Sequence, residues 1–151
     1  MQLSKAGLDL IKRSEGFRGR VYRDVAGILT IGYGHKLLRN ESFPDGINEA
    51  RAAGLLEADV QFAERVVERL VKVPLTQGQF DALVDFCFNM GAGRLAESSL
   101  LRDLNSGRYE AAGDQLLLWD HAGAEINEGL KTRREAEHSL WHEGSGAQQA
   151  A

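Results

Sequence analysis

The chain has 151 residues, of which 43% are hydrophobic and 26% charged, a composition typical of one globular domain. A single cysteine, Cys87, excludes an internal disulfide framework and a cysteine-based zinc ribbon. The whole chain carries a net charge of −4, yet residues 1–40 hold eight Lys/Arg and three Asp/Glu, a local excess of positive charge. This basic third suggests an anionic partner, and both nucleic acid and the bacterial wall fit that description.

No apolar run approaches the roughly 18 residues that a membrane span needs. The segment 1–12 also lacks a basic start followed by a continuous apolar core, so we expect no signal peptide. The sequence therefore predicts synthesis in a cytosol and no stable membrane insertion. A target outside the membrane would then require a separate route of release.

The first third of the chain is predicted to form a helix followed by a β-hairpin. Ser4 is a suitable N-cap, and Gly16 stands where a helix-ending glycine is common. Alternating apolar residues and a short turn then indicate two paired strands. The predicted ranges are a helix at 3–15, strands at 20–24 and 28–33 with a turn at 25–27, and a loop at 34–47.

Amphipathic spacing predicts helices over the rest of the chain. The first of them is long, and apolar residues recur along it every three or four positions. Thr76 and Gln79 form a capping-box pattern that opens the next helix. The predicted helical ranges are 48–71, 76–90, 95–106, 108–119 and 130–142. The order of helix, hairpin and then helices indicates an α+β fold with segregated parts.

Three side chains near the hairpin have the chemistry of a glycoside-hydrolase site. Glu15 is expected at the end of a helix, on the face shared with Leu8 and Ile11. Apolar surroundings and the helix dipole both favour a protonated carboxyl there, which can donate a proton. Asp24 is expected at the hairpin turn, where water keeps it ionised. The hydroxyl of Thr30, on the returning strand, could hold a water molecule against Asp24.

Each of these residues also has an ordinary structural explanation. A glutamate near a helix end is usually solvated, and an aspartate in a hairpin turn commonly serves turn geometry. A threonine in a strand commonly reflects β-propensity. The spacing Glu-x8-Asp-x5-Thr, set between a capped helix and a hairpin, is what favours catalysis over these explanations.

The sequence resembles the phage-type lysozymes of glycoside hydrolase family 24, also called endolysins or muramidases. The resemblance rests on the spacing of Glu15, Asp24 and Thr30 and on the string TIGYGH at 30–35. It continues through three later segments and covers nearly the whole chain. These segments are LTQGQFDALVDFCFNMGAG at 75–93, SSLLRDLNSGRYEAA at 98–112 and GLKTRREAE at 129–137.

The resemblance implies one lysozyme-like, two-lobed α+β domain over residues 1–143. A small N-terminal lobe with a β-hairpin, at about 14–47, is joined by the helix at about 48–71 to a larger helical lobe. The helical lobe is expected at about 72–143 together with the N-terminal helix. The final segment, 144–151, is predicted to be a flexible tail because it is small and polar.

The resemblance also implies an activity. The family hydrolyses the β-1,4 bond between N-acetylmuramic acid and N-acetylglucosamine in bacterial peptidoglycan. By the residue-for-residue match, Glu15 is the general acid, while Asp24 and Thr30 position and activate the attacking water with inversion at the anomeric carbon. An inverting pair needs its carboxyl groups roughly 6.5–9.5 Å apart.

Further matches concern the substrate. Phe88 and Asn89 match cleft residues that contact sugar in the family, and Ser99 matches another. Gly34 lies in the TIGYGH string, at a strand end where the backbone is expected to pass close to substrate. All four are therefore expected to contribute to substrate binding.

Other matches concern support of the site. His35 and Asp59 match a structural pair that ties the hairpin lobe to the long helix. Arg133, with Arg134 as the less favoured alternative, matches the arginine that approaches the catalytic glutamate, and its charge would favour the ionised form of Glu15. Lys36 stands where family members often have a neutral residue, so no sugar contact is carried over to it.

No metal site and no organic cofactor are expected. His138 and His142 are i, i+4 neighbours, but they lack the intervening glutamate of zincins, and a solvated helix face is favoured for them. The expected partner is peptidoglycan, with release dependent on a holin-type membrane lesion. No nucleic-acid binding is expected, and the family resemblance implies a monomer.

Two alternatives stay open at this point. A lytic transglycosylase cleaves the same bond by internal attack and needs only the glutamate, so the presence of Asp24 and Thr30 favours hydrolysis. A non-catalytic peptidoglycan-binding module that kept the fold is the second alternative. The intact set of Glu15, Asp24 and Thr30 argues against it.

Overall fold

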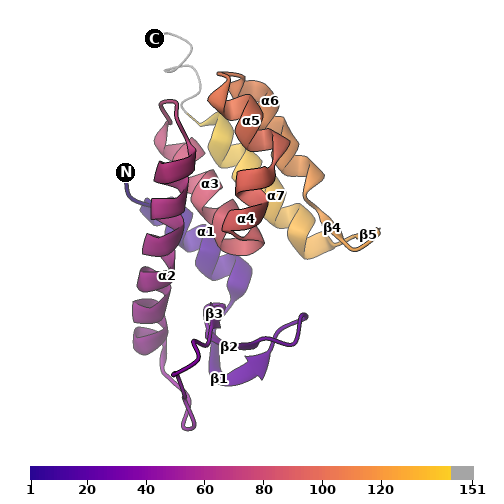
Figure 1. The fold of residues 1–151 in the computed structure, drawn as a ribbon. Helices are drawn as coiled ribbons and strands as arrows, with labels where there is room; N and C mark the ends of the chain where they lie inside the picture. The colour runs from indigo at the N-terminus through magenta and orange to yellow at the C-terminus, as the bar shows by residue number, and fades with distance from the viewer. Residues whose placement is uncertain (144–151) are drawn as a thin grey trace.

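The computed structural model describes residues 1–143, and a long helix joins a small sheet to a bundle of helices (Figure 1). The helices are α1 (Lys5–Glu15), α2 (Glu49–Leu70), α3 (Gln77–Met90), α4 (Ala92–Glu97), α5 (Ser99–Asn105), α6 (Tyr109–Gln115), the 3-10 helix η1 (Leu116–Leu118) and α7 (Glu128–His142). The strands are β1 (Arg18–Arg23), β2 (Leu29–Gly32), β3 (His35–Lys36), β4 (His121–Ala122) and β5 (Glu125–Ile126). The predicted α+β class is confirmed.

The helix ends follow the capping residues that the sequence indicates. Ser4 accepts a hydrogen bond from the backbone N–H of Gly7 at the start of α1. Gly16 ends α1 with φ at +70°, a conformation that residues with a side chain rarely adopt. Thr76 and Gln79 form the predicted capping box at the start of α3.

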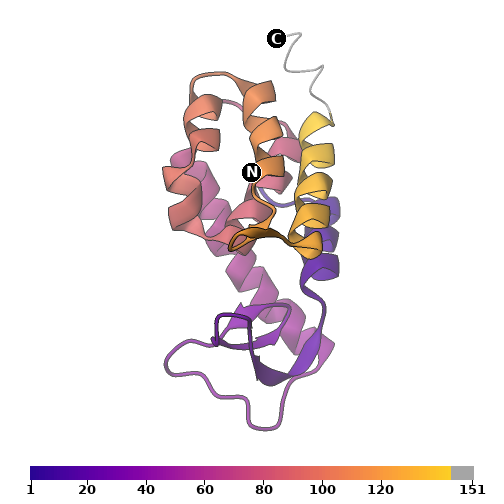
Figure 2. The same cartoon turned by 90° about the vertical axis from the view of Figure 1, so that its right-hand side faces the viewer.

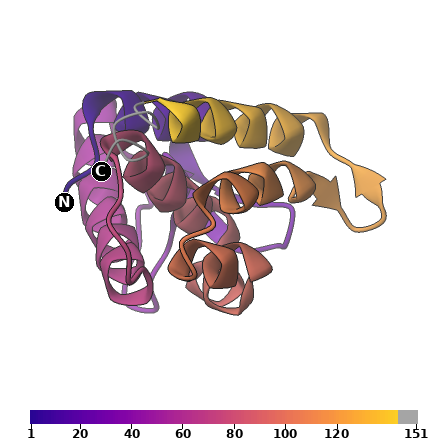
Figure 3. The same ribbon diagram turned by 90° about the horizontal axis from the view of Figure 1, so that it is seen from above.

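Helix α3 lies at the centre of the helical part, and α1, α2 and α7 pack against it (Figure 3). Its residues 78–87 are all buried, so the helix has no solvent-facing side over most of its length. Helix α2 contributes one apolar face to the same core and leaves its charged face in solvent. Within residues 1–143, no helix combines the length and hydropathy required to cross a bilayer.

The sheet has the order β1-β2-β3 and is antiparallel, and it lies at the far end of α2 from the helical part (Figure 2). Its register sets Thr30 between Tyr22 on one neighbouring strand and Lys36 on the other. The predicted turn at 25–27 is confirmed, because the N–H of Asp24 donates to the carbonyl of Ile28 across it at 2.9 Å. Strand β3, only two residues long, was not predicted.

Several predicted helix boundaries are wrong. The single helix expected at 95–106 is two helices, because the backbone at Ser98 is extended and its side chain caps α5 through the N–H of Leu101. The helix expected at 108–119 ends at Gln115 and continues as a 3-10 turn. The hairpin of β4 and β5 lies in a segment for which no element was predicted. The tail predicted at 144–151 lies outside the described residues.

Candidate active site

Glu15 is the last residue of α1, at the boundary between the helical part and the sheet. Its side chain is 20% exposed and lines a cleft of about 620 Å³. The other walls come from the end of α3, the segment before α7 and the first half of α7. Arg13 and Ser14 of α1 line the cleft beside Glu15, and the other walls include Asn89, Asn127, Gly129 and Arg133. A polymer segment can therefore reach this carboxyl from solvent.

Arg133 holds Glu15 from the α7 side. Its Nη1 donates to Glu15 Oε2 at 2.6 Å, while its Nε and Nη2 donate to the two carboxylate oxygens of Asp85 at 2.9 and 2.8 Å. Burial alone would lower the pKa of Arg133, but Asp85 and then Glu15 outweigh it and raise that pKa. The guanidinium is thus a fixed positive charge aimed at Glu15.

Behind Arg133 the ion network continues into the core. Arg134 Nη2 donates to Glu137 Oε2 at 2.7 Å, and Arg134 also lies 4.0 Å from Asp85. Arg134, Glu137 and Asp85 are fully buried. Burial, followed by the charge of Asp85, raises the pKa of Glu137 well above its ordinary value. The network joins α3 to α7 directly behind the cleft, and breaking it would leave buried charge uncompensated.

Asp24 follows β1 and is held by a different kind of contact. Its Oδ1 accepts hydrogen bonds from the backbone N–H groups of Ala26 and Ile28, both at 2.9 Å. Its Oδ2 accepts from Lys36 Nζ at 2.6 Å. The Lys36 hydrogen bond, then the Ile28 and Ala26 N–H groups, hold the pKa of Asp24 below its ordinary value. Asp24 is therefore ionised near neutral pH.

Thr30 is buried and shares an acceptor with Asp24. The Thr30 hydroxyl donates to the carbonyl of Ile28 at 2.8 Å, and the Asp24 N–H donates to the same carbonyl at 2.9 Å. The single hydroxyl proton of Thr30 is thus used in the hydrogen bond to Ile28, and the hydroxyl oxygen can only accept further hydrogen bonds. A water molecule near Asp24 could donate one hydrogen to Thr30 and the other to the carboxylate.

Gly34 brings the sheet up to Glu15. Its φ is +74°, and a Cβ at this position would lie 2.5 Å from Glu15 Oε1. Both the backbone conformation and the space therefore require glycine. This contact sets the β2–β3 turn against the end of α1, and so fixes the position of the hairpin that carries Asp24 and Thr30.

His35 joins the sheet to α2. Its Nδ1 lies 2.8 Å from Asp59 Oδ2, so the structure brings the predicted pair together. Its Nε2 lies 2.8 Å from Glu41 Oε1, a contact that the sequence analysis missed. Burial lowers the pKa of His35, but Glu41 and Asp59 together outweigh burial and raise it. The only sequence signal for Glu41 was an acid in the loop six residues after the histidine.

Of the side chains predicted to contact sugar, only Asn89 is among the residues that line the described cleft. Asn89 lines the cleft beside Glu15, and its buried Oδ1 has no hydrogen-bond partner within residues 1–143. Phe88 is partly buried and packs against the core. Ser99 does not line this cleft, and its hydroxyl donates to Gln115 Oε1 at 2.7 Å. Substrate contact by these residues stays a prediction, and it is supported most directly for Asn89.

The chain matches a described family over most of its length. The sequence model for phage lysozyme matches residues 12–137. The endolysin of Salmonella phage P22 is 41% identical over 144 residues, which cover 93% of this chain and 98% of that protein. The endolysin of Bacillus phage B103 is 42% identical over 147 residues, which cover 95% of this chain and 55% of that protein.

Solved structures agree with the sequence matches. The muramidase domain of SpmX from Asticaccaulis excentricus superimposes with a TM-score of 0.84 at 35% identity, covering 93% of this chain and 97% of that one. The chain spans about half the length of the B103 endolysin and nearly the full length of the P22 endolysin. Sequence and fold together lead to one conclusion: the chain belongs to the phage lysozyme family.

Proposed function

We propose that this chain is an endolysin that hydrolyses the β-1,4 bond between N-acetylmuramic acid and N-acetylglucosamine in peptidoglycan. The observation that carries the proposal is the contact of Gly34 with Glu15. Gly34 belongs to the turn that follows β2, in the part of the sheet that carries Asp24 and Thr30, and Glu15 lines the cleft. Endolysin and muramidase relatives of similar fold support the same activity.

Glu15 acts as the general acid in this proposal. Its protonated carboxyl donates to the glycosidic oxygen, so the leaving sugar departs as a neutral alcohol. The carboxylate that forms then interacts with Arg133 Nη1, which is already aimed at Glu15 Oε2. Because Asp85 holds the other guanidinium nitrogens, Arg133 can stabilise the new charge without having to move.

Asp24 and Thr30 act on the attacking water. Asp24 accepts a proton from the water, whose oxygen forms the new bond to the anomeric carbon on the face opposite the leaving group. The hydroxyl oxygen of Thr30 accepts a hydrogen bond from the other O–H group of the water and so orients it. Inversion follows from this single displacement. The backbone hydrogen bonds from Ala26 and Ile28 keep one oxygen of Asp24 occupied and leave Oδ2 beside Lys36.

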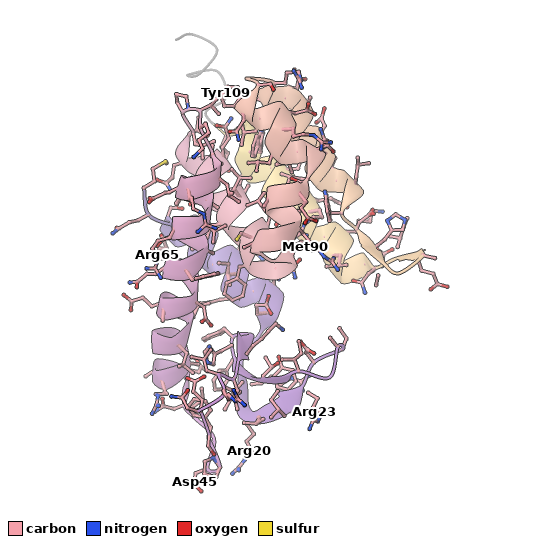
Figure 4. The ribbon with its side chains drawn as sticks, in the orientation of Figure 1. Arg20, Arg23, Asp45, Arg65, Met90 and Tyr109 are labelled. Carbon is pink, nitrogen blue, oxygen red and sulfur yellow. The ribbon has the colours of Figure 1, made fainter. Side chains whose placement is uncertain are left out.

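Charge on the sheet supports an anionic substrate. Arg20 and Arg23 project outward from the sheet, away from the helical part (Figure 4). Both belong to the basic segment 1–40. Peptidoglycan carries anionic groups, so these arginines would increase its rate of encounter with the cleft, and added salt would reduce that gain.

The decisive experiment is mass spectrometry of fragments released from purified peptidoglycan. Wild-type protein is expected to release reducing N-acetylmuramic acid ends, and Glu15→Gln none. Asp9→Asn is the control, because Asp9 lies on the same helix in an exposed pair with Lys5. Anhydro ends would identify a lytic transglycosylase, and wall binding without fragments would identify a binding module. The α-anomer as first product, observed by NMR, would establish inversion.

We further propose that the chain acts as a monomer and reaches the wall through a lesion made by a holin-type membrane protein. The N-terminal helix belongs to the folded domain, because α1 ends at Glu15 and packs against α3. Expression in bacteria should cause lysis only when a holin is co-expressed. Lysis without it, or a dimer in analytical ultracentrifugation, would contradict the proposal.

A further inference from the structure

We propose that Asp114, His138 and His142 form a binding site for a divalent transition-metal ion of the zinc type. One ligand atom from each of the three residues lies within 4.8 Å of the other two. Asp114 comes from α6 and the histidines from the C-terminal half of α7, and these helices pack side by side (Figures 2 and 3). The cleft beside Glu15 is lined by earlier residues of α7, so the two sites are separate.

The two histidines lie next to each other, and the backbone fixes the tautomer of one of them. Their rings lie 4.3 Å apart between centroids, on one face of α7. His142 Nδ1 lies 2.9 Å from the carbonyl oxygen of His138, and a carbonyl can only accept, so Nδ1 carries the hydrogen. The lone pair of His142 is therefore on Nε2. A backbone carbonyl that fixes the tautomer in this way is typical of metal-binding histidines.

Asp114 supplies the charged ligand. Its Oδ1 lies 3.0 Å from His138 Nε2, close to the roughly 3.3 Å that separates two ligands of a tetrahedral zinc ion. Zinc binding would move the hydrogen on His138 from Nε2 to Nδ1. A ligand atom of His142 lies within 4.8 Å of those of Asp114 and His138, and its exposed side chain is free to rotate toward an ion. A water molecule would complete the four ligands.

The backbone on which the three ligands stand is rigid. Trp141, between the two histidines, is buried and donates from Nε1 to the carbonyl of Tyr109 at 2.9 Å. Gly113, the neighbour of Asp114, packs against the Trp141 ring so closely that a Cβ there would collide with it. The spacing of α6 and α7 is thus fixed beside the site, which lowers the ordering cost of binding an ion.

The ligand set also selects the ion. Two imidazole nitrogens and one carboxylate suit Zn²⁺, Ni²⁺ and Cu²⁺, whereas Mg²⁺ and Ca²⁺ prefer sets made of oxygen. The sequence favoured a solvated helix face because the histidine pair lacks the intervening glutamate of zincins. It did not indicate Asp114 as a third ligand. That ligand, Asp114, is 24 residues from His138 and becomes its neighbour only through the packing of α6 on α7. The bound ion would tie the two helices together.

Thermal unfolding of the full chain with zinc tests the proposal. Zinc at about a hundred times its dissociation constant should raise Tm by roughly 5 to 10 °C, and Mg²⁺ should not. His142→Ala and Asp114→Asn should each weaken zinc affinity at least about tenfold in calorimetry. The matched control is His121→Ala, because His121 is exposed and paired with Asp120 rather than with these residues. It should bind zinc as the wild type does.

Imidazole NMR adds a readout that depends on no substitution. Zinc should shift the ring signals of His138 and His142 and leave those of His35 and His121 in place. Signals moving at His121 instead, equal stabilisation by Mg²⁺, or unchanged affinity in both variants would each overturn the proposal. Hydrolysis of the wall by His142→Ala should match the wild type, so failure of the metal site and failure of the proposed function are distinguishable.

Discussion

The two carboxyl groups of the proposed reaction are held by opposite means. Glu15 depends on Arg133, which is 118 residues away in sequence and is itself held by buried Asp85. Asp24 depends on groups within 12 residues of it, namely two backbone N–H groups of its own turn and Lys36. The general acid is therefore supported by the tertiary core, and the base by one hairpin. Substitutions that affect one support should leave the other intact.

The largest expected effect is on stability, at the acid side. Asp85→Asn removes the charge that Arg133 and Arg134 share in the core, and it should cost roughly 3–5 kcal/mol of unfolding free energy. Urea denaturation measures this. Asp9→Asn removes an exposed charge and should change stability by less than about 1 kcal/mol. Equal losses in both variants would mean that the buried network contributes no special support.

The next largest effect is expected on kcat, from a substitution in the hairpin that carries Asp24. Thr30→Ala removes the oxygen proposed to orient water, and it should lower kcat about 100-fold with little change in KM. The hydroxyl bonds only within its own hairpin, so we expect the circular dichroism spectrum and Tm to stay close to wild type. A wild-type kcat would remove Thr30 from the mechanism.

His35→Ala should weaken the connection between sheet and α2, with roughly 1–3 kcal/mol lost. The folded-state pKa of His35 is raised, so the charged histidine stabilises the fold fully below its unfolded pKa of about 6.5. That contribution is lost as pH rises through the folded-state value. Unfolding measured across pH should show the difference from wild type shrinking toward alkaline pH. A constant or growing difference would contradict the assigned pairing.

The smallest effect concerns the pH dependence of activity, and it tests which groups lower the pKa of Asp24. Lys36→Met removes the first cause of the lowered pKa of Asp24, so the acidic limb of the kcat/KM profile should move to higher pH. Lys36→Arg, which keeps the charge, is the matched control and should retain the wild-type limb. Stability should change little because Lys36 is exposed. An unmoved acidic limb in Lys36→Met would show that the hairpin backbone alone keeps Asp24 ionised.

The same contrast explains what could be predicted from the sequence. Features that depend on residues close together in the chain could be predicted from the sequence. They are the helix caps, the turn at 25–27 and the spacing of Glu15, Asp24 and Thr30. The resemblance supplied Arg133 and the pairing of His35 with Asp59, but no local pattern did. Asp85 was read only as part of a helix, although it fixes Arg133.

The remaining misses have the same cause. Ser98 splits a helix because its side chain caps the second half, which competes with simple continuation of the apolar pattern. Lys36 meets Asp24 only because β3 pairs with β2, and a two-residue strand carries no periodic signal. Asp114 likewise gains its partner through the packing of α6 on α7, and Glu41 gains His35 through the folding of the loop after β3. Tertiary neighbours and very short strands are what a single sequence leaves hidden.

Arg133 contacts both Glu15 and Asp85, and this pair of contacts bears on how heat inactivates the protein. The guanidinium of Arg133 connects Glu15, the proposed proton donor, to the buried contact between α3 and α7, so this carboxyl and the core share one support. Melting of the helical part should therefore abolish wall hydrolysis in the same transition, without a temperature range in which a folded but inactive enzyme accumulates. Heat resistance of the lytic activity and heat resistance of the core would then be one selectable trait.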